Sequence, residues 1–287
     1  SDVWRVIQMN GTAEYEILKG LKFKGMLGYY YAYNELDNQE FTYELYGYDE
    51  QKDNYYVTNR MSNPYRERNR EKVEDQFSNF QLNFDRKFGK HAVVAVAGFE
   101  ASQRKRPKMW IHSTPVSNAM DLIRLKEIQE FNDDGNRTEA RMGYLGRINY
   151  SYADKYLVEL IARWDGSWKF RPDNRWGFFP SASLGWRVSE ENFWKESKIG
   201  EIVTNLKLRG SYGEVGDDAV SDYSAFDYLP GYNYNSGGAV IDGNWVVGTS
   251  TRGLPNQTLS WMTAKILDIG VDLGFLNNRL NIQFDYF

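Results

Sequence analysis

Residues 79–88 alternate between apolar and polar side chains at nearly every position. The apolar side chains at even positions are Phe80, Leu82, Phe84 and Phe88. Arg86 is the one even position that breaks the pattern, and the odd positions carry asparagine, glutamine, aspartate and lysine. In an extended strand, successive side chains point to opposite faces. The pattern therefore predicts a β-strand with an apolar environment on one face and water on the other.

The same alternation recurs along the chain in pairs of segments. The expected strands are 14–18 and 21–31, 79–88 and 93–99, 141–152 and 156–165, 181–188 and 205–212, and 267–273 and 280–286. Four of these pairs are joined by tight turns near residues 19, 89, 154 and 277. Residues 190–202 read instead as a short helical connection. The sequence thus predicts about ten strands in antiparallel hairpins.

The lengths of the expected strands and loops indicate a membrane barrel. Strands of roughly 9 to 15 residues exceed the usual five or six and suit a tilted membrane crossing. The long polar loops are expected at 33–72, 104–136, 167–177 and 215–257. They fall at the strand ends opposite the tight turns, a layout typical of outer-membrane barrels. We therefore expect an all-β fold, an antiparallel up-and-down transmembrane β-barrel present in part, as about ten strands of a larger barrel.

Composition narrows the function classes. The mean hydropathy of -0.65 leaves no window of about 20 apolar residues, which excludes a helical membrane protein. The chain has no cysteine and two histidines, so we expect no disulfide, no metal site and no cofactor. A net charge of -4 argues against nucleic acid as a partner. Neither a Gly-x-Ser-x-Gly nor a His-Glu-x-x-His motif occurs, so we expect no enzyme activity.

The segment 154–191 carries a family resemblance. Its motifs are DKYL at 154–157, RWDGS at 163–167 and RWGFFPSASLGWRVSEE at 175–191. Together with LKLRGSYGEVGD at 206–217, LPNQTLSW at 254–261, LGFLNNRL at 273–280 and YEILKGLKFKG at 15–25, they resemble the SusC/RagA-like TonB-dependent transporters of Bacteroidetes outer membranes. The similar blocks cover nearly the whole chain, and 163–187 is the most specific of them.

The resemblance implies a location, a mechanism and partners. It implies a protein of the cell outer membrane that imports oligosaccharides or peptides, is energised by the TonB complex and is capped by a SusD-like surface lipoprotein. The family's TonB box and N-terminal plug are not found here, and about ten strands cannot close a 22-stranded barrel. The chain also starts without a signal peptide. We therefore expect residues 1–287 to be part of one barrel domain, a fragment of its wall.

Three residues in and after the RWDGS motif are candidates for contact with a substrate. Arg163 and Asp165 point to the polar face if the even positions face lipid, and Trp168 opens the following loop. The alternative is that Arg163 and Asp165 pair with neighbours on the wall while Asp165 shapes the loop entry. Lys169 stands where the family usually has an arginine, so a role attached to that arginine does not transfer directly.

Loop 215–257 is rich in aromatic residues among glycines and asparagines. Its aromatic candidates are Tyr223, Phe226, Tyr228, Tyr232, Tyr234 and Trp245. Such rings suit stacking on sugars or gripping of peptides, and the alternative is that the loop packs on itself. Asp217, Asp218, Asp222 and Asp227 suggest a calcium site but lack the spacing of a calcium-binding loop. Residues 132–136 are more typical of a turn.

Three function hypotheses remain open from the sequence. The first is the TonB-dependent importer, the second a soluble secreted β-sandwich that binds carbohydrate or accompanies a glycosidase, and the third a passive porin or surface protein. For the barrel, we expect three apolar rows on the lipid face. These rows are Phe80, Leu82 and Phe84; Tyr156, Val158 and Leu160; and Leu280, Ile282 and Phe284. A sandwich would instead bury such rows against a second sheet.

Overall fold

The computed structural model describes residues 1–287 except 63, 116, 121–122, 124–127, 134–137 and 220–224. The strands are β1 (Asp2–Leu18), β2 (Leu21–Glu40), β3 (Tyr43–Asp49), β4 (Asn54–Met61), β5 (Tyr65–Phe88), β6 (His91–Lys105), β7 (Lys108–Ser113), β8 (Ile128–Asp133), β9 (Thr138–Tyr152), β10 (Tyr156–Ser167), β11 (Trp176–Arg187), β12 (Val203–Asp217), β13 (Tyr232–Ile241), β14 (Asn244–Thr251), β15 (Met262–Phe275) and β16 (Leu280–Tyr286). The helical segments are η2 (Pro172–Asn174), η3 (Val188–Glu190), α1 (Asn192–Lys195) and α2 (Lys198–Ile202).

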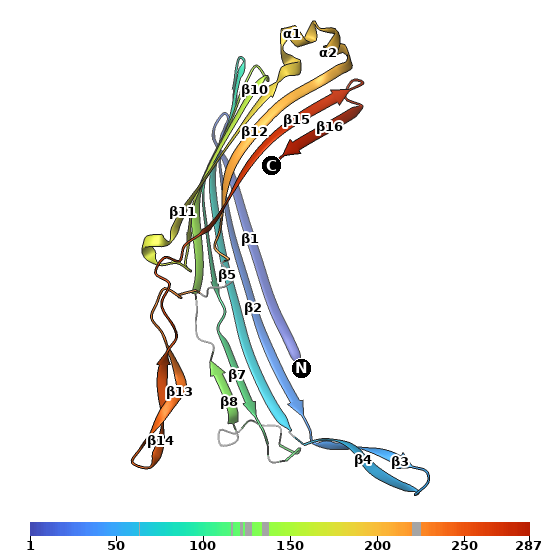
Figure 1. Ribbon diagram of the computed structural model, residues 1–287, viewed down its shortest axis with the longest axis vertical. Helices are drawn as coiled ribbons and strands as arrows, with labels where there is room; N and C mark the ends of the chain where they lie inside the picture. The colour runs from blue at the N-terminus through green and yellow to red at the C-terminus, as the bar shows by residue number, and fades with distance from the viewer. Residues whose placement is uncertain (63, 116, 121–122, 124–127, 134–137, 220–224) are drawn as a thin grey trace. The chain divides into compact units, whose positions relative to one another are not determined.

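The main sheet pairs its strands in the order β1-β2-β5-β6-β9-β10-β11-β12-β15-β16 (Figure 1). The strands of this path pair in the order in which they occur in the sequence. The strands missing from it belong to hairpins beside the main sheet. β3 with β4 and β13 with β14 form separate two-stranded hairpins, and β7 and β8 attach beside β5. The antiparallel, up-and-down sheet of about ten strands confirms the expected fold class.

Tight turns close the hairpins where the sequence predicts them. Turn residues lie at 19–20, 89–90, 153–155 and 276–279. At the first turn, Gly20 adopts a φ of +84°, and a Cβ there would lie 2.5 Å from the carbonyl oxygen of Asp85. Both observations require glycine at this position. The helical connection expected at 190–202 is also confirmed, as η3, α1 and α2.

The strands are longer than the sequence predicts, and three of the predicted loops contain strands. β1 begins at Asp2 rather than near residue 14, and β5 begins at Tyr65, inside the expected loop 33–72. Loops 104–136 and 215–257 likewise contain strands, namely β7 with β8 and β13 with β14. The first half of β5 is polar on both faces, so it lacks the apolar row by which alternation reveals a strand.

Contacts divide the chain into two units. The first unit comprises residues 1–11, 27–77 and 102–139. Within it, the buried Arg66 donates hydrogen bonds to the backbone carbonyls of Glu40, Asn118 and Met120 at 2.7 to 3.2 Å. One guanidinium therefore ties together the end of β2, the start of β5 and the segment after β7.

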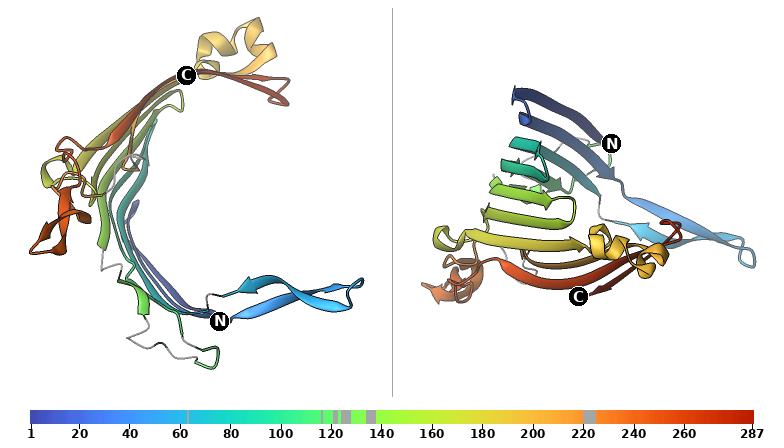
Figure 2. Two further views of the ribbon diagram at one scale, coloured as in Figure 1. Left: turned by 60° about the horizontal axis from the view of Figure 1, so that its bottom comes forward. Right: turned by 90° about the horizontal axis from the view of Figure 1, so that it is seen from above.

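The second unit comprises residues 12–26, 78–101 and 140–287. It contains all of β10, β11, β12, β15 and β16, which lie side by side in a single layer (Figure 2). A few aromatic residues are buried beside the loops, among them Phe170 at 1% exposure and Phe179 at 6%. The rings of both lie within 5.5 Å of the Trp261 ring, centre to centre. This cluster packs the loop that follows β10 against the start of β15.

Candidate functional site

The strands of the second unit carry opposite chemistry on their two faces. On one face, Leu160 lies between its cross-strand partners Ile148 and Ala182, and its side chain is 50% exposed. On the other face, the neighbouring Glu159 has Ser183 as a cross-strand partner. The expected apolar rows of β10 and β16 are thus exposed or half-buried. A soluble sandwich would have to cover this face with a second sheet.

Aromatic rings gather at both ends of the apolar face. At the turn end, the rings of Tyr152 and Tyr156 lie 6.4 Å apart. At the loop end, the rings of Trp164 and Trp176 lie 4.9 Å apart, and that of Tyr144 lies 6.1 Å from Trp164. From 156 to 164 the strand rises about 26 Å at ~3.3 Å per residue, or about 20 Å along the membrane normal for the usual tilt. The two belts therefore bracket an apolar band of about the height that a membrane barrel presents to lipid.

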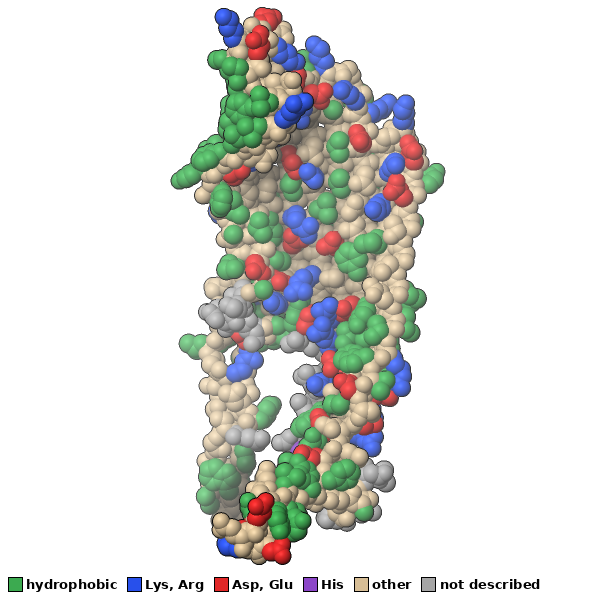
Figure 3. All heavy atoms as spheres, turned by 90° about the vertical axis from the view of Figure 1, so that its right-hand side faces the viewer, with side chains coloured by type: hydrophobic (Ala, Val, Ile, Leu, Met, Phe, Trp, Pro, Cys, Tyr) green, Lys and Arg blue, Asp and Glu red, His purple; other side chains and the backbone are tan. Residues whose placement is uncertain are grey.

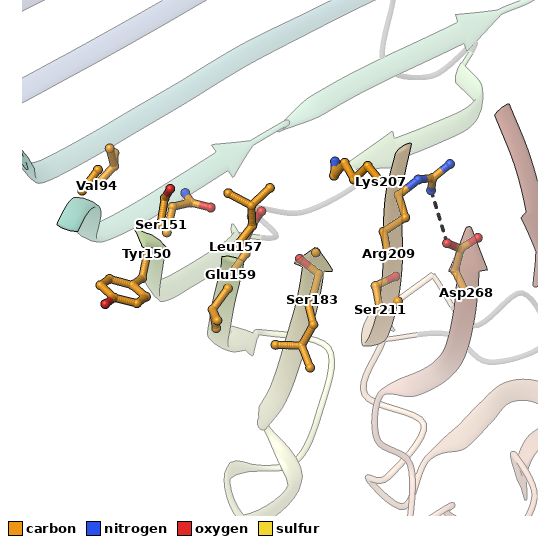
Figure 4. A pocket seen from close by; sticks show the side chains of 16 residues that line it. Val94, Tyr150, Ser151, Leu157, Glu159, Ser183, Lys207, Arg209, Ser211 and Asp268 are labelled. Atoms are coloured by element: carbon orange, nitrogen blue, oxygen red, sulfur yellow. Dashed lines mark hydrogen bonds and ion pairs between the residues drawn. The ribbon is translucent and has the colours of Figure 1, made fainter. Parts of the chain in front are cut away.

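The polar face contains a hollow of about 430 Å³ (Figure 4). The polar side chains that line it are Asn149, Ser151, Glu159, Ser183, Lys207, Arg209, Ser211 and Asp268. Five of these positions form one row across five strands, because they are successive cross-strand partners. The row runs Asn149, Glu159, Ser183, Ser211 and Asp268. Short hydroxyl side chains in the middle of the row leave the space that forms the hollow.

Ion pairs across strands surround the hollow. Arg209 on β12 contacts Asp272 at 3.1 Å and Asp268 at 3.5 Å on β15, and Asp285 at 2.5 Å on β16. Arg147 on β9 contacts Glu159 on β10 at 2.7 Å. Figure 4 shows Arg209 reaching Asp268 from the next strand. Positive and negative side chains are likewise interspersed over the face seen in Figure 3.

Sequence analysis did not identify the cluster around Arg209. Arg209 lies in the block 206–217, but the aspartates lie about 60 to 75 residues later and no motif links them to it. A signal was nevertheless present, since the turn at 276–279 fixes the pairing of β15 with β16 and so places Asp272 and Asp285 on the same face. Arg209 faces Gly270, so Asp268 and Asp272 are its diagonal neighbours and Asp285 lies across the glycine. Opposite charges at such positions would then have indicated the pairs.

Arg163 and Asp165 bind each other on the polar face. The guanidinium donates two hydrogen bonds to the carboxylate, at 2.8 and 2.9 Å. Gly143 is the cross-strand partner of Asp165, and a Cβ at this glycine would lie 2.1 Å from the Asp165 Oδ1 atom. The absent side chain makes room for the pair. The structure thus agrees with the alternative in which the two charges pair on the wall, although as neighbours on one strand.

Trp168 belongs to a small aromatic cluster in the loops. Its ring lies 5.5 Å from that of Phe226, edge to face, and the ring of Phe226 lies 6.2 Å from that of Tyr228. The structure therefore brings together Trp168 and Tyr228, two of the predicted contact residues, through Phe226. The cluster also supports the packing alternative for this part of the loop. Tyr223 lies outside the described residues.

Asp218 ties the segment after β12 to the end of β10. Its carboxylate accepts hydrogen bonds from Arg141 and Ser167, both at 2.6 Å, and its carbonyl accepts one from Lys169. Burial by itself raises the pKa of Asp218, but the bonds from Arg141 and Ser167 outweigh burial and hold the pKa below its usual value. An aspartate engaged in this way is a loop tether. Asp222, another member of the suggested calcium group, lies outside the described residues, as do residues 134–136 of the expected turn.

The remaining aromatic candidates stand on the β13–β14 hairpin. Tyr232 pairs with Thr251 and Tyr234 with Thr249, while Trp245 lies near the other end, opposite Val240. All three side chains are well exposed, Tyr234 at 82%. The hairpin therefore presents its aromatic rings to the surroundings. The Trp245 ring also lies over Gly238 of the same hairpin, where a Cβ would come within 2.6 Å of it, so contact with a solute and packing within the hairpin both stay open for these residues.

The described part of the chain offers few other kinds of site. Among the described residues, no group of His, Cys, Asp and Glu side chains could hold a metal ion. No helix within the described ranges is long and apolar enough to cross a membrane.

Comparison with known proteins identifies the family. The profile described as "TonB dependent receptor-like, beta-barrel" matches residues 8–287. Among curated relatives, TonB-dependent receptor P3 of Formosa agariphila is 29% identical over 97% of this chain and 26% of its own length. TonB-dependent receptor SusC of Bacteroides thetaiotaomicron is 40% identical over 50% of this chain and 14% of its own length. The chain thus spans about a quarter or less of the length of these relatives.

Solved structures agree on the fold. The structure of the RagAB peptide transporter superposes with a TM-score of 0.77 at 18% identity, covering 99% of this chain and 29% of that one. The same importer in its open-open state also gives a TM-score of 0.77.

These matches contradict the soluble β-sandwich. The family consists of transporters and not enzymes, as the sequence indicated. The chain belongs to the TonB-dependent receptor β-barrel family, is SusC/RagA-like, and forms part of a barrel of the outer membrane.

Proposed function

We propose that this chain is a section of the barrel wall of a TonB-dependent importer of oligosaccharides or peptides. The observation that carries the proposal is the two-faced sheet, with an exposed apolar band between two aromatic belts on one side and a face of hydroxyl and ion-paired side chains on the other, where a hollow has a mixed polar and apolar lining. An apolar outer face and a polar interior are what a transport barrel requires. The rest of the barrel, the plug and the TonB box belong, in this proposal, to other parts of the protein.

The polar face then lines the import path. Hydroxyl, amide and carboxylate groups in the row from Asn149 to Asp268 offer a solute hydrogen bonds in place of those it makes with water. The charges beside the row are paired, as Arg147 with Glu159 and Arg209 with three aspartates. Arg209 and Lys207 offset two of the three aspartates, so this cluster keeps one negative charge in excess, while Arg147 and Glu159 balance each other. Such a surface suits neutral oligomers, or peptides that carry both charges.

The loops form the outer mouth in this proposal. Trp168, Tyr228, Tyr232, Tyr234 and Trp245 would contact the solute, with the exposed rings of the β13–β14 hairpin reaching it first. Flat aromatic faces suit sugar rings because they replace water over the apolar ring face without requiring a charge. Arg163 and Asp165, which also face the polar side, would contact it only if their mutual ion pair opened.

The partners follow from the relatives. The similar solved structures are of a two-component peptide transporter, RagAB, and a curated relative is named SusC. We infer that the complete protein works with a SusD-like surface lipoprotein that hands over the oligomer, and with the TonB complex that supplies energy. Peptides and oligosaccharides both remain candidate substrates.

A substitution series in the full-length transporter tests the proposal. Replacing Tyr232, Tyr234 and Trp245 together by alanine should reduce uptake, while replacing all three by phenylalanine should largely preserve it, because the flat rings remain. Uptake is measured over a panel of labelled glycans and peptides, in cells with and without TonB. Heat-dependent mobility on gels confirms barrel insertion for both variants. Uptake that persists without TonB would contradict the importer, and unchanged uptake by the alanine variant would remove the hairpin from the contact surface.

A further inference from the structure

The connection between β11 and β12 differs from the other turns at its end of the sheet. The other hairpins at this end close within two to four residues, whereas residues 188–202 form η3, α1 and α2 (Figure 1). A segment of this length is not needed to join two neighbouring antiparallel strands. Its structure therefore calls for a role other than reversal of the chain.

Hydrogen bonds attach this connection to the apolar side of the sheet. The Glu191 carboxylate accepts hydrogen bonds from the Tyr156 hydroxyl at 2.7 Å, from Lys155 at 2.8 Å and from the Trp186 indole at 3.3 Å. Tyr156 and Trp186 are cross-strand partners on the apolar face, and Tyr156 belongs to the aromatic belt at the turn end. The connection is thus fixed next to that belt.

The connection is well ordered by its own contacts. Val188 is buried, and the Trp194 indole donates a hydrogen bond to the carbonyl of Val203 at 3.1 Å. The Ser197 hydroxyl accepts a hydrogen bond from the backbone N–H of Gly200, which caps α2. These contacts hold the segment in one conformation against the sheet.

Three large apolar side chains of the connection nevertheless point away from the protein. Phe193 is 60% exposed, Ile199 59% and Ile202 67%. Between them in the sequence lie exposed charged residues, Lys195 in α1, Glu196 just after it, and Lys198 and Glu201 in α2. α1 and α2 are single turns and have no separate apolar and charged faces of their own. Exposed apolar side chains beside an aromatic belt, with charged side chains next to them, nevertheless suit the boundary between headgroups and acyl chains.

We propose that residues 188–202 form an interfacial anchor, in which Phe193, Ile199 and Ile202 lie at the boundary between phospholipid headgroups and acyl chains of the periplasmic leaflet. The proposal rests on the proposed function, which makes the apolar face the lipid face and the turn end the periplasmic end. Glu191 joins the anchor directly to Tyr156 of the aromatic belt. Because that belt faces lipid in the proposed function, we infer that lipid also contacts the three apolar side chains. Anchoring the end of the wall in this way fixes the depth of the barrel in the membrane.

Spin labels in the full-length transporter test the anchor. The 287 residues contain no cysteine, so single cysteines here label only the chosen site of this segment. Labels at Phe193, Ile199 and Ile202 are compared with a label at Glu196 in phosphatidylethanolamine–phosphatidylglycerol bilayers. Oxygen concentrates in the acyl region, whereas a water-soluble nickel chelate does not enter it. We expect the oxygen-to-nickel collision ratio at the three apolar sites to exceed that at Glu196 several-fold.

A label at Leu160 separates failure of the anchor from failure of the barrel. A high ratio at Leu160 with water-like ratios at the three sites would overturn the anchor and leave the barrel intact. A water-like ratio at Leu160 would overturn the lipid-facing wall and the anchor with it. Low collision with both reagents at the three sites would show that protein covers them, which also overturns the lipid anchor. The Phe193→Gln, Ile199→Gln and Ile202→Gln variants, made together, should increase the mobility of a label at Tyr152, in the same belt, and unchanged mobility there would overturn the anchor.

Discussion

Replacing Leu160 by arginine places a charge in the middle of the apolar band. Leu160 lies four residues from Tyr156 in one aromatic belt and four from Trp164 in the other, so it is at the midpoint of β10 between the belts. Its side chain is half exposed and points away from the polar face. An arginine here would have to lie in the hydrocarbon or stretch about 10 Å along the membrane normal to reach either interface.

The expected loss of folding free energy depends on this depth in the membrane. A lipid-facing arginine at the bilayer midplane destabilises a barrel by about 2 to 4 kcal/mol. The matched control is Ser183→Arg, because Ser183 lies at nearly the same depth, on the opposite face, directly across from Glu159. An arginine there meets a hydrated hollow and an acidic neighbour. Its cost should therefore stay below about 1 kcal/mol.

Equilibrium unfolding measures the difference. The full-length receptor and both variants are refolded into lipid vesicles and titrated with guanidinium, and the free energies of unfolding are compared at equal slopes. Leu160→Arg should lower the free energy clearly more than Ser183→Arg. Equal losses on the two faces, or a larger loss for Ser183→Arg, would refute the assignment of the apolar face to lipid.

Two further substitutions test local contacts. Hydrogen bonds from a lysine, a tyrosine and a tryptophan lower the pKa of Glu191 from 4.5 to about 2. The contribution of the ionised Glu191 to folding stability is therefore fully present above pH 4.5 and is lost as the pH falls towards 2. Acid unfolding followed by fluorescence should therefore show a steeper loss between pH 4.5 and 2 for the wild type than for Glu191→Gln, and identical profiles would contradict this. Gly143→Ala should destabilise by about 1 to 3 kcal/mol because the new methyl group displaces Asp165 from Arg163. Gly146→Ala, on the same strand with open space around it, should be neutral or stabilising in the same thermal melts.

Local alternation in the sequence determined the hairpins of the second unit. The strands around residues 153–155 and 276–279 were predicted with their correct faces because one face must meet apolar surroundings and the other water. The same rule failed in the first unit. β3, β4 and the first half of β5 have polar or aromatic residues on both faces, so no period of two marks them.

Motifs also determined the family. They did not determine which side chains meet. Strand register places Gly143 opposite Asp165 and Gly270 opposite both Arg209 and Asp285. Only this register makes room for Asp165 and lets Arg209 reach three aspartates on two later strands. Likewise, only the hydrogen bonds of Glu191 to the aromatic belt show that the exposed apolar residues of this connection lie beside the apolar face. The alternation of side chains is local and can be read directly from the sequence. Contacts across strands depend on register and twist, which arise only when the sheet assembles.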